Sequence, residues 1–478
     1  MNQNRNFIGG AWEESSAATR NINPSDTNDV IGEYASADRP SADAAIDAAA
    51  TAFKTWSRSN PEVRSDILDR IGTEILARRE ELGTLLSREE GKILVEGIGE
   101  VVRAGRVFKF FAGEALRLNG ERVRSVRSGV DIDVVREPEG VIGLITPWNF
   151  PIAIPAWKIA PALAYGNCVV FKPAELVPGS AWALAEIISR SGLPEGVFNL
   201  VIGSGSTVGQ TLVDSTKVCA ISFTGSVQTG RRIGAASFES GKKFQLEMGG
   251  KNPLIVLNDA NLELAVNTAV NGAFFSTGQR CTASSRLIVQ DGIHDRFVEA
   301  VEEKLGALKV GHALDTQSEI GPVVSAAQLA QNIEYIQIGK GEGARLAIGG
   351  ERLTRDHSGH YMSPALLVET DNRMRINREE IFGPVASIIR VKDYEEAVET
   401  ANDTQFGLSS GICTTSLKYA EDFKHRSEAG MVMVNLPTAG VDYHVPFGGR
   451  KGSSYGPREQ GSYAREFYTS VKTAYTSA

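Results

Sequence analysis

The sequence predicts an α/β protein in which short buried strands alternate with helices to build doubly wound parallel sheets. Two series of short apolar runs, over 141–257 and 286–435, support this fold class, because Gly, Pro or Ser and then a helical pattern follow the runs. Continuous apolar runs are typical of parallel strands, which are buried on both faces. A chain of 478 residues has room for two or three such domains.

The amino-terminal region is predicted to be helical. Apolar residues recur at helical spacing through 41–56, where Ser41 is the expected N-cap. Ile67, Ile71 and Ile75 repeat this spacing in a second helix. We therefore expect the chain to open with amphipathic helices.

Residues 122–135 have a different pattern, in which Val130, Ile132 and Val134 alternate with polar residues behind a Ser128-Gly129 turn. This pattern predicts a β-hairpin with one wet face. The tail 466–475 also has one apolar face without an obvious partner in its own domain. The hairpin is poorly placed to line a buried core.

The two series of strands come next. The first contains the apolar runs 141–145, 168–171, 197–202, 220–223 and 254–257. The second contains strands near 286–289, 386–391 and 431–435, with helices near 295–308 and 394–402. We interpret the second series as a second α/β domain.

Composition and charge exclude several classes of protein. Apolar residues make up 42% and charged residues 23%, which is ordinary globular usage. The net charge is −8 and no basic block is present, so nucleic acid is not an expected partner. The amino end lacks an apolar signal region, and prolines interrupt the most apolar stretch, 141–171, so we expect no contact with a membrane.

The cysteines and histidines suggest neither disulfides nor a metal. The four cysteines are scattered, with no Cys-x-x-Cys pair, which favours a reducing, cytoplasmic setting. His357 and His360 are the only histidines with ligand-like spacing, and no cysteine is near them. We therefore expect no metal site.

Two glycine turns favour a nucleotide site. Gly203, Gly205 and Gly209 directly follow a predicted strand, at a spacing one residue longer than the dinucleotide fingerprint. An ordinary strand-to-helix turn that needs positive φ is the alternative. At the end of another strand, the backbone amides around Gly225 and Ser226 could face a phosphate.

Cys281 is the candidate nucleophile, because it lies in a polar loop directly after Arg280, and a nearby arginine can favour a thiolate. Cys168, Cys219 and Cys413 lie in or beside apolar runs, where cysteine behaves as a small hydrophobe. No histidine has the context of a cysteine-protease partner, so another group must act as the base.

Glu247 and Asn149 are candidates for the remaining roles. Glu247 ends a β-like run and precedes two glycines that allow close approach of another backbone, so it is either a base or an exposed strand-end carboxylate. Asn149 lies between two prolines at a strand end, where its amide can donate to a developing oxyanion or cap a turn.

Seven short motifs occur along the chain in a fixed order. They are Thr146-Pro-Trp-Asn-Phe-Pro151, Phe171-Lys-Pro-Ala-Glu175, Phe223-Thr-Gly-Ser226, Leu246-Glu-Met-Gly-Gly250, Gly278-Gln-Arg-Cys281, Glu379-Glu-Ile-Phe-Gly-Pro384 and Pro446-Phe-Gly-Gly449. In this order and at these separations they together resemble the aldehyde dehydrogenase superfamily. The resemblance runs from about Phe7 to Tyr475.

The resemblance implies a Rossmann-type cofactor domain, an α/β catalytic domain and a small β oligomerisation arm. We assign residues 1–120 and 140–250 to the NAD-binding domain, 251–452 to the catalytic domain, and 121–139 with 453–478 to the arm. Members of the family exchange such arms between subunits, so a homodimer or homotetramer is expected.

The resemblance also implies a mechanism. Cys281 matches the nucleophile, Glu247 the general base, and Asn149 with the backbone amide of Cys281 the oxyanion hole, while Lys158 matches a lysine that helps the proton relay. A thiolate adduct makes the aldehyde carbon tetrahedral, so that it can release hydride and leave a thioester. Water activated by the glutamate then releases the acid. Branches that transfer the acyl group to coenzyme A commonly lack this glutamate, so its presence favours hydrolysis.

NAD is the cofactor that the resemblance implies, with NADP possible. In matching family members, the residues corresponding to Lys172 and Glu175 hold the adenine ribose, and a carboxylate there repels a 2′-phosphate. The other expected cofactor residues are Thr146, Pro147, Trp148, Gly205, Gly225 and Ser226, together with Glu380 and Phe382 at the nicotinamide ribose.

The substrate expectation depends on two arginines. Arg280 and Arg103 match positions that face the substrate funnel, where branches acting on semialdehydes use arginines to hold a distal carboxylate. Segments 278–286 and 435–444, with Gly461, resemble the 2-oxoglutarate semialdehyde branch, so oxidation of 2,5-dioxopentanoate to 2-oxoglutarate is expected.

Several alternatives stay open on the sequence alone. Arg103 can lie on a solvated helix face, and Arg280 can be a structural hydrogen-bonding residue. Phe150, Trp157 and Tyr443 suit an aromatic aldehyde or another semialdehyde equally well. A coenzyme A-acylating enzyme and a catalytically silent NAD-binding scaffold are two further possibilities.

Overall fold

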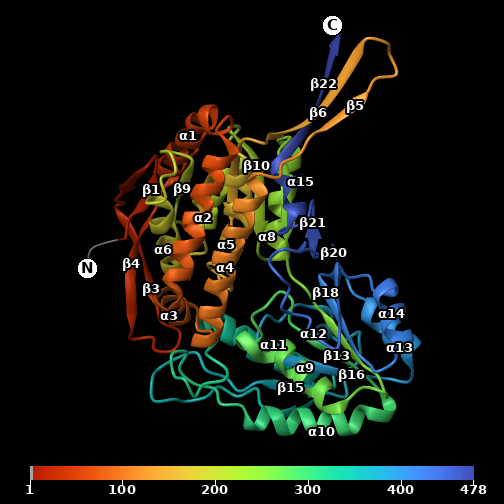
Figure 1. Cartoon of the computed structure of the whole chain (residues 1–478). Helices are drawn as coiled ribbons and strands as arrows, with labels where there is room; N and C mark the ends of the chain where they lie inside the picture. Colours follow the sequence, from red (N-terminus) through yellow and green to blue (C-terminus); the bar gives the residue numbers. More distant parts are fainter. Residues whose placement is uncertain (1–3, 478) are drawn as a thin grey trace.

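Two twisted, largely parallel sheets organise the computed structural model, which describes residues 4–477 (Figure 1). The first sheet has eight strands in the order β2-β1-β9-β8-β7-β10-β11-β21. Its strands are β1 (Asn6–Ile8), β2 (Ala11–Glu13), β7 (Val141–Ile145), β8 (Cys168–Lys172), β9 (Phe198–Leu200), β10 (Val218–Thr224), β11 (Lys243–Glu247) and β21 (Ser454–Tyr455). The predicted α/β fold class is confirmed.

The strand order of this sheet creates a switch point. The chain runs from β7 to β8 and β9 on one side, and then crosses to β10 and β11 on the other. These five strands are parallel, so β7 and β10 end at the same edge, with Ile145 beside Phe223. Ligands of open α/β sheets bind outside the strand carboxyl ends at such a point.

Helices cover this sheet and enclose an apolar core of buried Ile, Val, Leu and Phe side chains. Asp38, not Ser41, caps the first helix, because the Asp38 carboxylate accepts the Ser41 amide at 3.0 Å. The helices are α1 (Arg39–Trp56), α2 (Pro61–Ala77), α3 (Arg79–Glu90), α4 (Leu94–Ala115), α5 (Ala153–Ala164), α6 (Pro178–Ser189), η1 (Gly205–Gly209), α7 (Gln210–Asp214) and α8 (Val227–Glu239).

The expectation that the chain opens with helices is wrong, because four strands precede α1. β1 and β2 extend the first sheet, and β3 (Ala17–Ile22) pairs with β4 (Val30–Ser36) as a separate ribbon. Most residues of β3 are exposed and half are polar, so its composition carries little strand signal.

The second sheet has seven strands in the order β14-β15-β16-β13-β12-β18-β19, and only β14 runs antiparallel to its neighbour. Its strands are β12 (Pro253–Val256), β13 (Arg286–Gln290), β14 (Arg345–Ile348), β15 (Ala365–Val368), β16 (Val385–Val391), β18 (Ser409–Cys413) and β19 (Met431–Val434). Around it lie α9 (Leu262–Phe274), η2 (Phe275–Gly278), α10 (Asp291–Ala307), α11 (Ala326–Gly341), α12 (Arg375–Arg378), α13 (Tyr394–Asn402) and α14 (Leu417–Arg426). β17 (Phe406–Gly407) and β20 (Arg450–Lys451) form a small separate ribbon.

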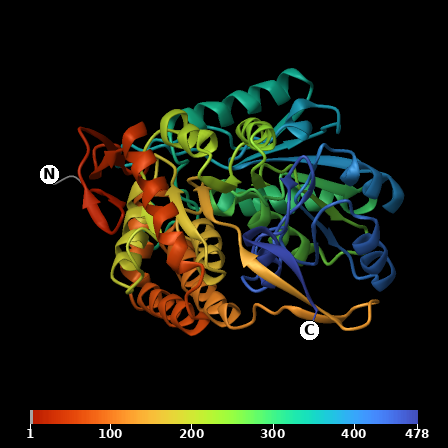
Figure 2. The same cartoon turned by 90° about the horizontal axis from the view of Figure 1, so that it is seen from above.

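A three-stranded arm projects from the body of the molecule (Figures 1 and 2). It consists of β5 (Glu121–Arg124), β6 (Val130–Pro138) and β22 (Thr469–Ser477), with β6 in the middle. Of the segment assigned to the arm at the end of the chain, only β22 joins it. β21 lies on the first sheet, while η3 (Ser462–Ala464) leads into α15 (Arg465–Tyr468), whose Phe467 and Tyr468 enter the first core. The assigned domain boundaries stay predictions.

Across residues 4–477, no helix combines the length and the apolarity needed to cross a lipid bilayer.

Candidate active site

A cavity of about 310 Å³ opens at the switch point between β7 and β10, and we call it the Trp148 cavity. The segment after β7 contributes Pro147, Trp148 and Asn149 to its wall, and the turn after β10 contributes Gly225 and Ser226. The facing wall comes from segments around the second sheet, through Gln328, Gln331, Glu380 and Phe382. The Trp148 and Phe382 rings meet edge to face at 5.3 Å across this space.

The turn after β10 presents backbone donors to the Trp148 cavity. Ser226 caps α8, so the first amides of this helix point toward the cavity edge. The amino end of a helix attracts anions such as a pyrophosphate. The geometry of this turn therefore suits the phosphate role expected for Gly225 and Ser226.

Four of the expected cofactor residues do not line this cavity: Thr146, Lys172, Glu175 and Gly205. Lys172 ends β8 and is buried; its Nζ donates to the Pro173 carbonyl at 2.9 Å, and burial lowers its pKa. Gly205 begins η1 and is exposed. The segments with Lys172 and Gly205 follow β8 and β9, so both lie at the same strand-end edge as the cavity, beyond β7.

A second cavity, of about 350 Å³, lies on the other side of Cys281, and we call it the Arg103 cavity. Four of the five expected substrate residues line it: Arg103 from α4, Phe150, Trp157 from α5, and Arg280. Tyr443 is not in this wall; its ring packs near Phe110 at 6.3 Å. Cys281 lines both cavities, so its thiol lies where the two meet.

The segment before Cys281 has an unusual backbone. Ser276, Thr277 and Gly278 adopt φ values of 51°, 56° and 62°. This left-handed region costs energy for residues with a Cβ, and such strain persists only where the surroundings hold it. The surrounding structure therefore holds this segment in an unfavourable conformation, which fixes the position of the residues that follow it.

The expectation that Arg280 favours a Cys281 thiolate is wrong for this arrangement of side chains. The Arg280 guanidinium instead donates to the Glu96 carboxylate at 3.1 Å and to the Ser276 hydroxyl at 3.0 Å. Burial, together with the nearby Glu380 and Glu247 carboxylates, raises the pKa of the Cys281 thiol to about 12, with burial the largest cause. The backbone amides of residues 281 and 282 act in the opposite direction.

Asn149 lies beside the nucleophile segment. Its buried side-chain Nδ2 donates to the Gln279 carbonyl at 3.0 Å, which uses one of the two N–H donors of the amide. Asn252 holds the other side of the segment by donating to the Cys281 carbonyl at 2.8 Å. The chain thus places an amide side chain and the Cys281 backbone next to each other.

Glu247 ends β11 and is almost fully buried. The Ser454 hydroxyl donates to its Oε2 at 2.6 Å, and burial raises the pKa of this carboxyl to about 8. The alternative of an exposed strand-end carboxylate is excluded. The carboxylate lies close enough to Cys281 to affect the pKa of the thiol, but its direct hydrogen bond is to Ser454.

The glycines after Glu247 permit close contacts, as expected. A Cβ on Gly250 would lie 2.7 Å from the Cys281 carbonyl oxygen, and a Cβ on Gly249 would overlap the Glu380 carboxylate. Gly250 also donates its amide to Glu380 at 2.9 Å. These contacts bring the Glu247, Cys281 and Glu380 segments together.

Lys158 lies in a buried ion pair behind Glu247. Its ammonium contacts the Glu459 carboxylate, both side chains being fully buried, and donates to the Ser222 hydroxyl at 2.7 Å. Glu459 raises the pKa of Glu247 while Lys158 lowers it, although burial is the larger cause of the shift. This pair is electrostatically coupled to the expected base.

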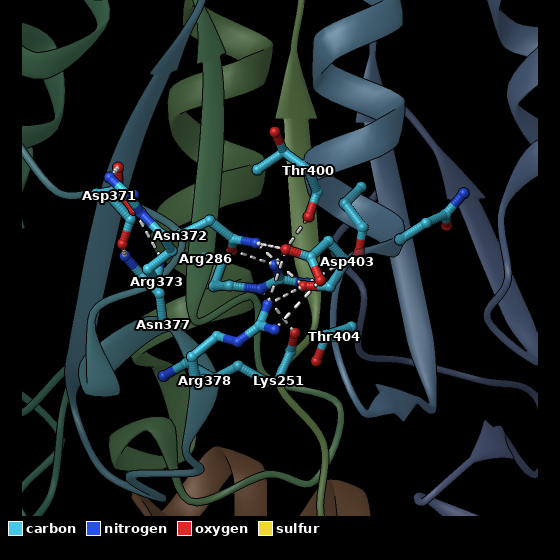
Figure 3. A network of polar contacts seen from close by, with 12 residues as sticks. Lys251, Arg286, Asp371, Asn372, Arg373, Asn377, Arg378, Thr400, Asp403 and Thr404 are labelled. Atoms are coloured by element: carbon cyan, nitrogen blue, oxygen red, sulfur yellow. Dashed lines mark hydrogen bonds and ion pairs between the residues drawn. The ribbon is translucent and has the colours of Figure 1, made fainter.

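A buried arginine supports both catalytic segments from the far side (Figure 3). Arg286 begins β13, five residues after Cys281, and its Nε donates to the Lys251 carbonyl at 3.1 Å. Its other nitrogens donate to Asn372 and to the carbonyls of Thr400 and Ala401. Arg286 therefore ties the loop after Glu247 to the end of α13.

Some polar residues of these walls were not predicted from the sequence as site residues. Lys92, Glu96 and Glu100 line the Arg103 cavity, and Gln328 and Gln331 line the Trp148 cavity. The available signal was the i, i+4 spacing of Glu96 and Glu100 with Lys92 one turn earlier. Within residues 4–477, no group of three or more His, Cys, Asp or Glu side chains could hold a metal ion.

Comparisons of this chain with protein families, with relatives and with solved structures agree on one family. The profile of the Aldehyde dehydrogenase family matches residues 12–474. An alpha-ketoglutaric semialdehyde dehydrogenase of Bacillus subtilis is 42% identical over 474 residues, covering 98% of this chain and 97% of the relative. An alpha-ketoglutarate semialdehyde dehydrogenase of Haloferax volcanii is 41% identical over 478 residues, covering 99% of each.

Among solved structures, betaine aldehyde dehydrogenase of Staphylococcus aureus in complex with NAD+ superposes with a TM-score of 0.97 at 35% identity. The match covers 99% of this chain and 95% of that one. The chain therefore belongs to the aldehyde dehydrogenase family, whose members are oxidoreductases that act on aldehydes.

Proposed function

We propose that this protein oxidises 2,5-dioxopentanoate, the semialdehyde of 2-oxoglutarate, to 2-oxoglutarate, with NAD as the hydride acceptor. The observation that carries the proposal is that two guanidinium groups, of Arg103 and Arg280, line the same cavity as the Cys281 thiol. A substrate with an aldehyde at one end and a carboxylate at the other matches this arrangement. The names of the two semialdehyde dehydrogenase relatives support the same substrate.

In the proposed reaction, the Cys281 sulfur forms a bond to the aldehyde carbon as the thiol loses its proton to water. The carbonyl electron pair moves to oxygen, where the Asn149 amide and the Cys281 backbone N–H stabilise it. A nicotinamide ring held in the Trp148 cavity would supply the hydride acceptor. Collapse of the oxyanion expels hydride from the former aldehyde carbon and leaves a thioester on Cys281. Glu247 then takes a proton from water, which attacks the thioester and releases the acid.

Several features of the chain support NAD as the cofactor. The amino end of α8 suits a pyrophosphate, and the Trp148 and Phe382 rings provide flat walls for the nicotinamide half. The Glu175 carboxylate lies near Lys172 and would repel a 2′-phosphate, so NADP is expected to bind less well. The four free cysteines are consistent with a cytoplasmic setting.

Replacing Arg103 with Met is expected to lower kcat/KM for 2,5-dioxopentanoate about ten- to a hundredfold, because a charge-assisted hydrogen bond is lost. Arg103 is packed beside the Trp157 ring at 5.7 Å, and its guanidinium donates to two neutral groups, the Val441 carbonyl and the Gln460 side chain, rather than to a carboxylate. Hexanal, which has no carboxylate, should change only a few-fold. Steady-state kinetics on the two aldehydes measure the difference.

The matched variant Arg280→Met should have a smaller selective effect, because Glu96 already neutralises this guanidinium. Equal losses on both aldehydes in Arg103→Met would identify a structural role for the arginine and remove the support for a semialdehyde. No loss on either aldehyde would favour the second candidate, an aromatic aldehyde. The stacked Trp157 and Phe447 rings, 5.4 Å apart in the wall of the Arg103 cavity, favour that candidate.

The rate of thioester hydrolysis is expected to rise with pH through about 8. The base must be ionised, and burial raises the pKa of Glu247 to about 8, so the active carboxylate is the minor form below that pH. Single-turnover release of the acid measured between pH 6 and 10 reports this pKa. A rate that is flat across this range would exclude Glu247 as the base.

A dimer or tetramer is expected in solution. Val123, Val135, Val471 and Tyr475 are apolar side chains exposed on the arm, which has unpaired edges at β5 and β22. Light scattering should give a multiple of the 51.4 kDa chain, and removal of β22, which spares the buried Phe467 and Tyr468, should reduce the number of subunits. An active monomer, or a truncated chain with an unchanged number of subunits and unchanged activity, would contradict this expectation.

A further inference from the structure

Helix α4 carries two carboxylates, Glu96 and Glu100, that face the Arg103 cavity one helical turn apart. Residues at i and i+4 lie on the same face of a helix, about 6 Å apart along its axis. Neither carboxylate has a role in the reaction described above. Each accepts hydrogen bonds from one of the two segments that carry the oxyanion donors.

Glu100 holds the segment that follows Asn149. Its Oε1 accepts the amides of Ile152 and Ala153 at 2.9 and 3.0 Å, and its Oε2 accepts the Lys92 ammonium at 2.8 Å. Lys92 in turn donates to the Asn149 carbonyl at 2.6 Å. Lys92 and Glu100 therefore fix the backbone at Asn149 and just after it.

The surroundings of Lys92 hold its ammonium in place. The ammonium is fully buried, lies 3.9 Å from the centre of the Phe150 ring, and is also 3.9 Å from the Glu90 carboxylate. A buried charge must keep its partners, because losing one leaves an uncompensated charge in a poorly polarisable interior. The ion pair thus leaves the Asn149 segment little freedom to shift.

Glu96 holds the segment that precedes Cys281. Its Oε1 accepts the Ser276 amide at 2.9 Å and the Arg280 guanidinium at 3.1 Å. Ser276 is the first residue of the strained left-handed stretch, and Arg280 is the residue directly before the nucleophile. One carboxylate therefore anchors both ends of the strained turn.

We propose that Glu96 and Glu100, with Lys92 as the counter-ion of Glu100, are positioning residues that set the distance between the two oxyanion donors, the Asn149 amide and the Cys281 backbone N–H. Helix α4 belongs to the first domain, whereas Cys281 belongs to the second. The two carboxylates therefore fix the position of the Asn149 segment relative to the Cys281 segment, where the aldehyde carbon would react.

The test separates oxyanion stabilisation from the other steps. Hydrolysis of 4-nitrophenyl acetate needs the thiol and the oxyanion donors but no hydride transfer, whereas alkylation by iodoacetamide needs the thiol alone. In Glu100→Gln, the new amide N–H₂ faces the Lys92 ammonium. Both groups are hydrogen-bond donors and cannot pair, so Lys92 no longer holds the Asn149 carbonyl in place. We expect kcat for aldehyde oxidation and the rate of ester hydrolysis each to fall about ten- to a hundredfold.

In the same variant, KM, NAD binding and the alkylation rate should stay within about threefold, because none of them needs the oxyanion donors. Glu96→Gln should lower ester hydrolysis in the same range. Glu114→Gln is the matched control, since Glu114 is a buried carboxylate on the same helix that pairs with Arg117 and does not line the cavity. It should leave all five measurements unchanged.

Ester hydrolysis within threefold of the parent protein in either Glu96→Gln or Glu100→Gln would overturn the proposal, as would an equal loss in Glu114→Gln. If Glu100→Gln does not fold, Lys92→Met/Glu100→Met decides, because replacing a buried ion pair with apolar residues is often neutral for stability. That folded variant should still hydrolyse the ester slowly. Parental ester hydrolysis in it would refute the positioning role.

Discussion

Cys281→Ala is expected to abolish aldehyde oxidation, with kcat lowered by about 10⁴-fold or more, while NAD still binds. The thiol forms the covalent adduct, and without it the aldehyde carbon stays trigonal and does not release hydride. The cofactor contacts lie on other residues of the Trp148 cavity, so its affinity should change little. Steady-state NADH formation and quenching of Trp148 fluorescence by NAD measure the two effects separately.

Cys219→Ala is the matched control, because Cys219 is an exposed thiol on β10, away from both cavities. This variant should retain full activity. Turnover of more than a few per cent in Cys281→Ala, with the protein folded, would reject Cys281 as the nucleophile. Loss of NAD binding in Cys281→Ala would instead show that the change disturbs the whole site.

Glu247→Gln is expected to give one rapid burst of NADH per active site, after which turnover stalls. Hydride transfer precedes hydrolysis, so loss of the base blocks only the second half of the reaction. The change should be well tolerated in the folded state, since Gln can still accept the Ser454 hydrogen bond. Stopped-flow absorbance of NADH gives the amplitude of the burst and the steady rate in one experiment.

Hydroxylamine provides the control for Glu247→Gln. It is a stronger nucleophile than water and attacks a thioester without a general base. Because it also converts free aldehyde to an oxime, it is added after the burst and after unreacted aldehyde has been removed, and it should then release the acyl group as a hydroxamic acid. Absence of a burst in the folded variant would move the role of Glu247 to the first step. A burst after which hydroxylamine releases no hydroxamic acid would mean that the enzyme stalls on something other than a thioester.

The sequence predicted the buried strands of the two sheets better than the exposed strands and the helix ends. Runs such as 141–145 are apolar on both faces, and this pattern indicates a buried parallel strand whatever its neighbours are. β3 was missed because most of its residues are exposed and half are polar, so that pairing with β4, rather than burial, supports it. The cap of α1 was displaced by three residues because Asp38 competes with Ser41 for the same role.

Within the site, local context identified the reactive residues, but not the partners of the charged ones. Cys281 stood out because its loop is polar whereas Cys168 and Cys413 are buried in strands. Arg280 forms an ion pair with Glu96, which is 184 residues away in the sequence. This contact depends on the packing of α4 against the segment before Cys281, which no local sequence pattern reveals. Glu96 and Glu100 themselves resemble a solvated helix face until the structure places the Asn149 and Cys281 segments beside them.

The most direct test of the proposed chemistry is mass spectrometry of Glu247→Gln after incubation with NAD and 2,5-dioxopentanoate. We predict an adduct on the peptide that contains Cys281, lighter by two hydrogen atoms than simple addition of the aldehyde, because hydride transfer has oxidised the adduct to a thioester. An adduct with the full mass of the aldehyde, or one on another residue, would contradict the assignment. So would an unmodified Cys281 after a complete burst of NADH.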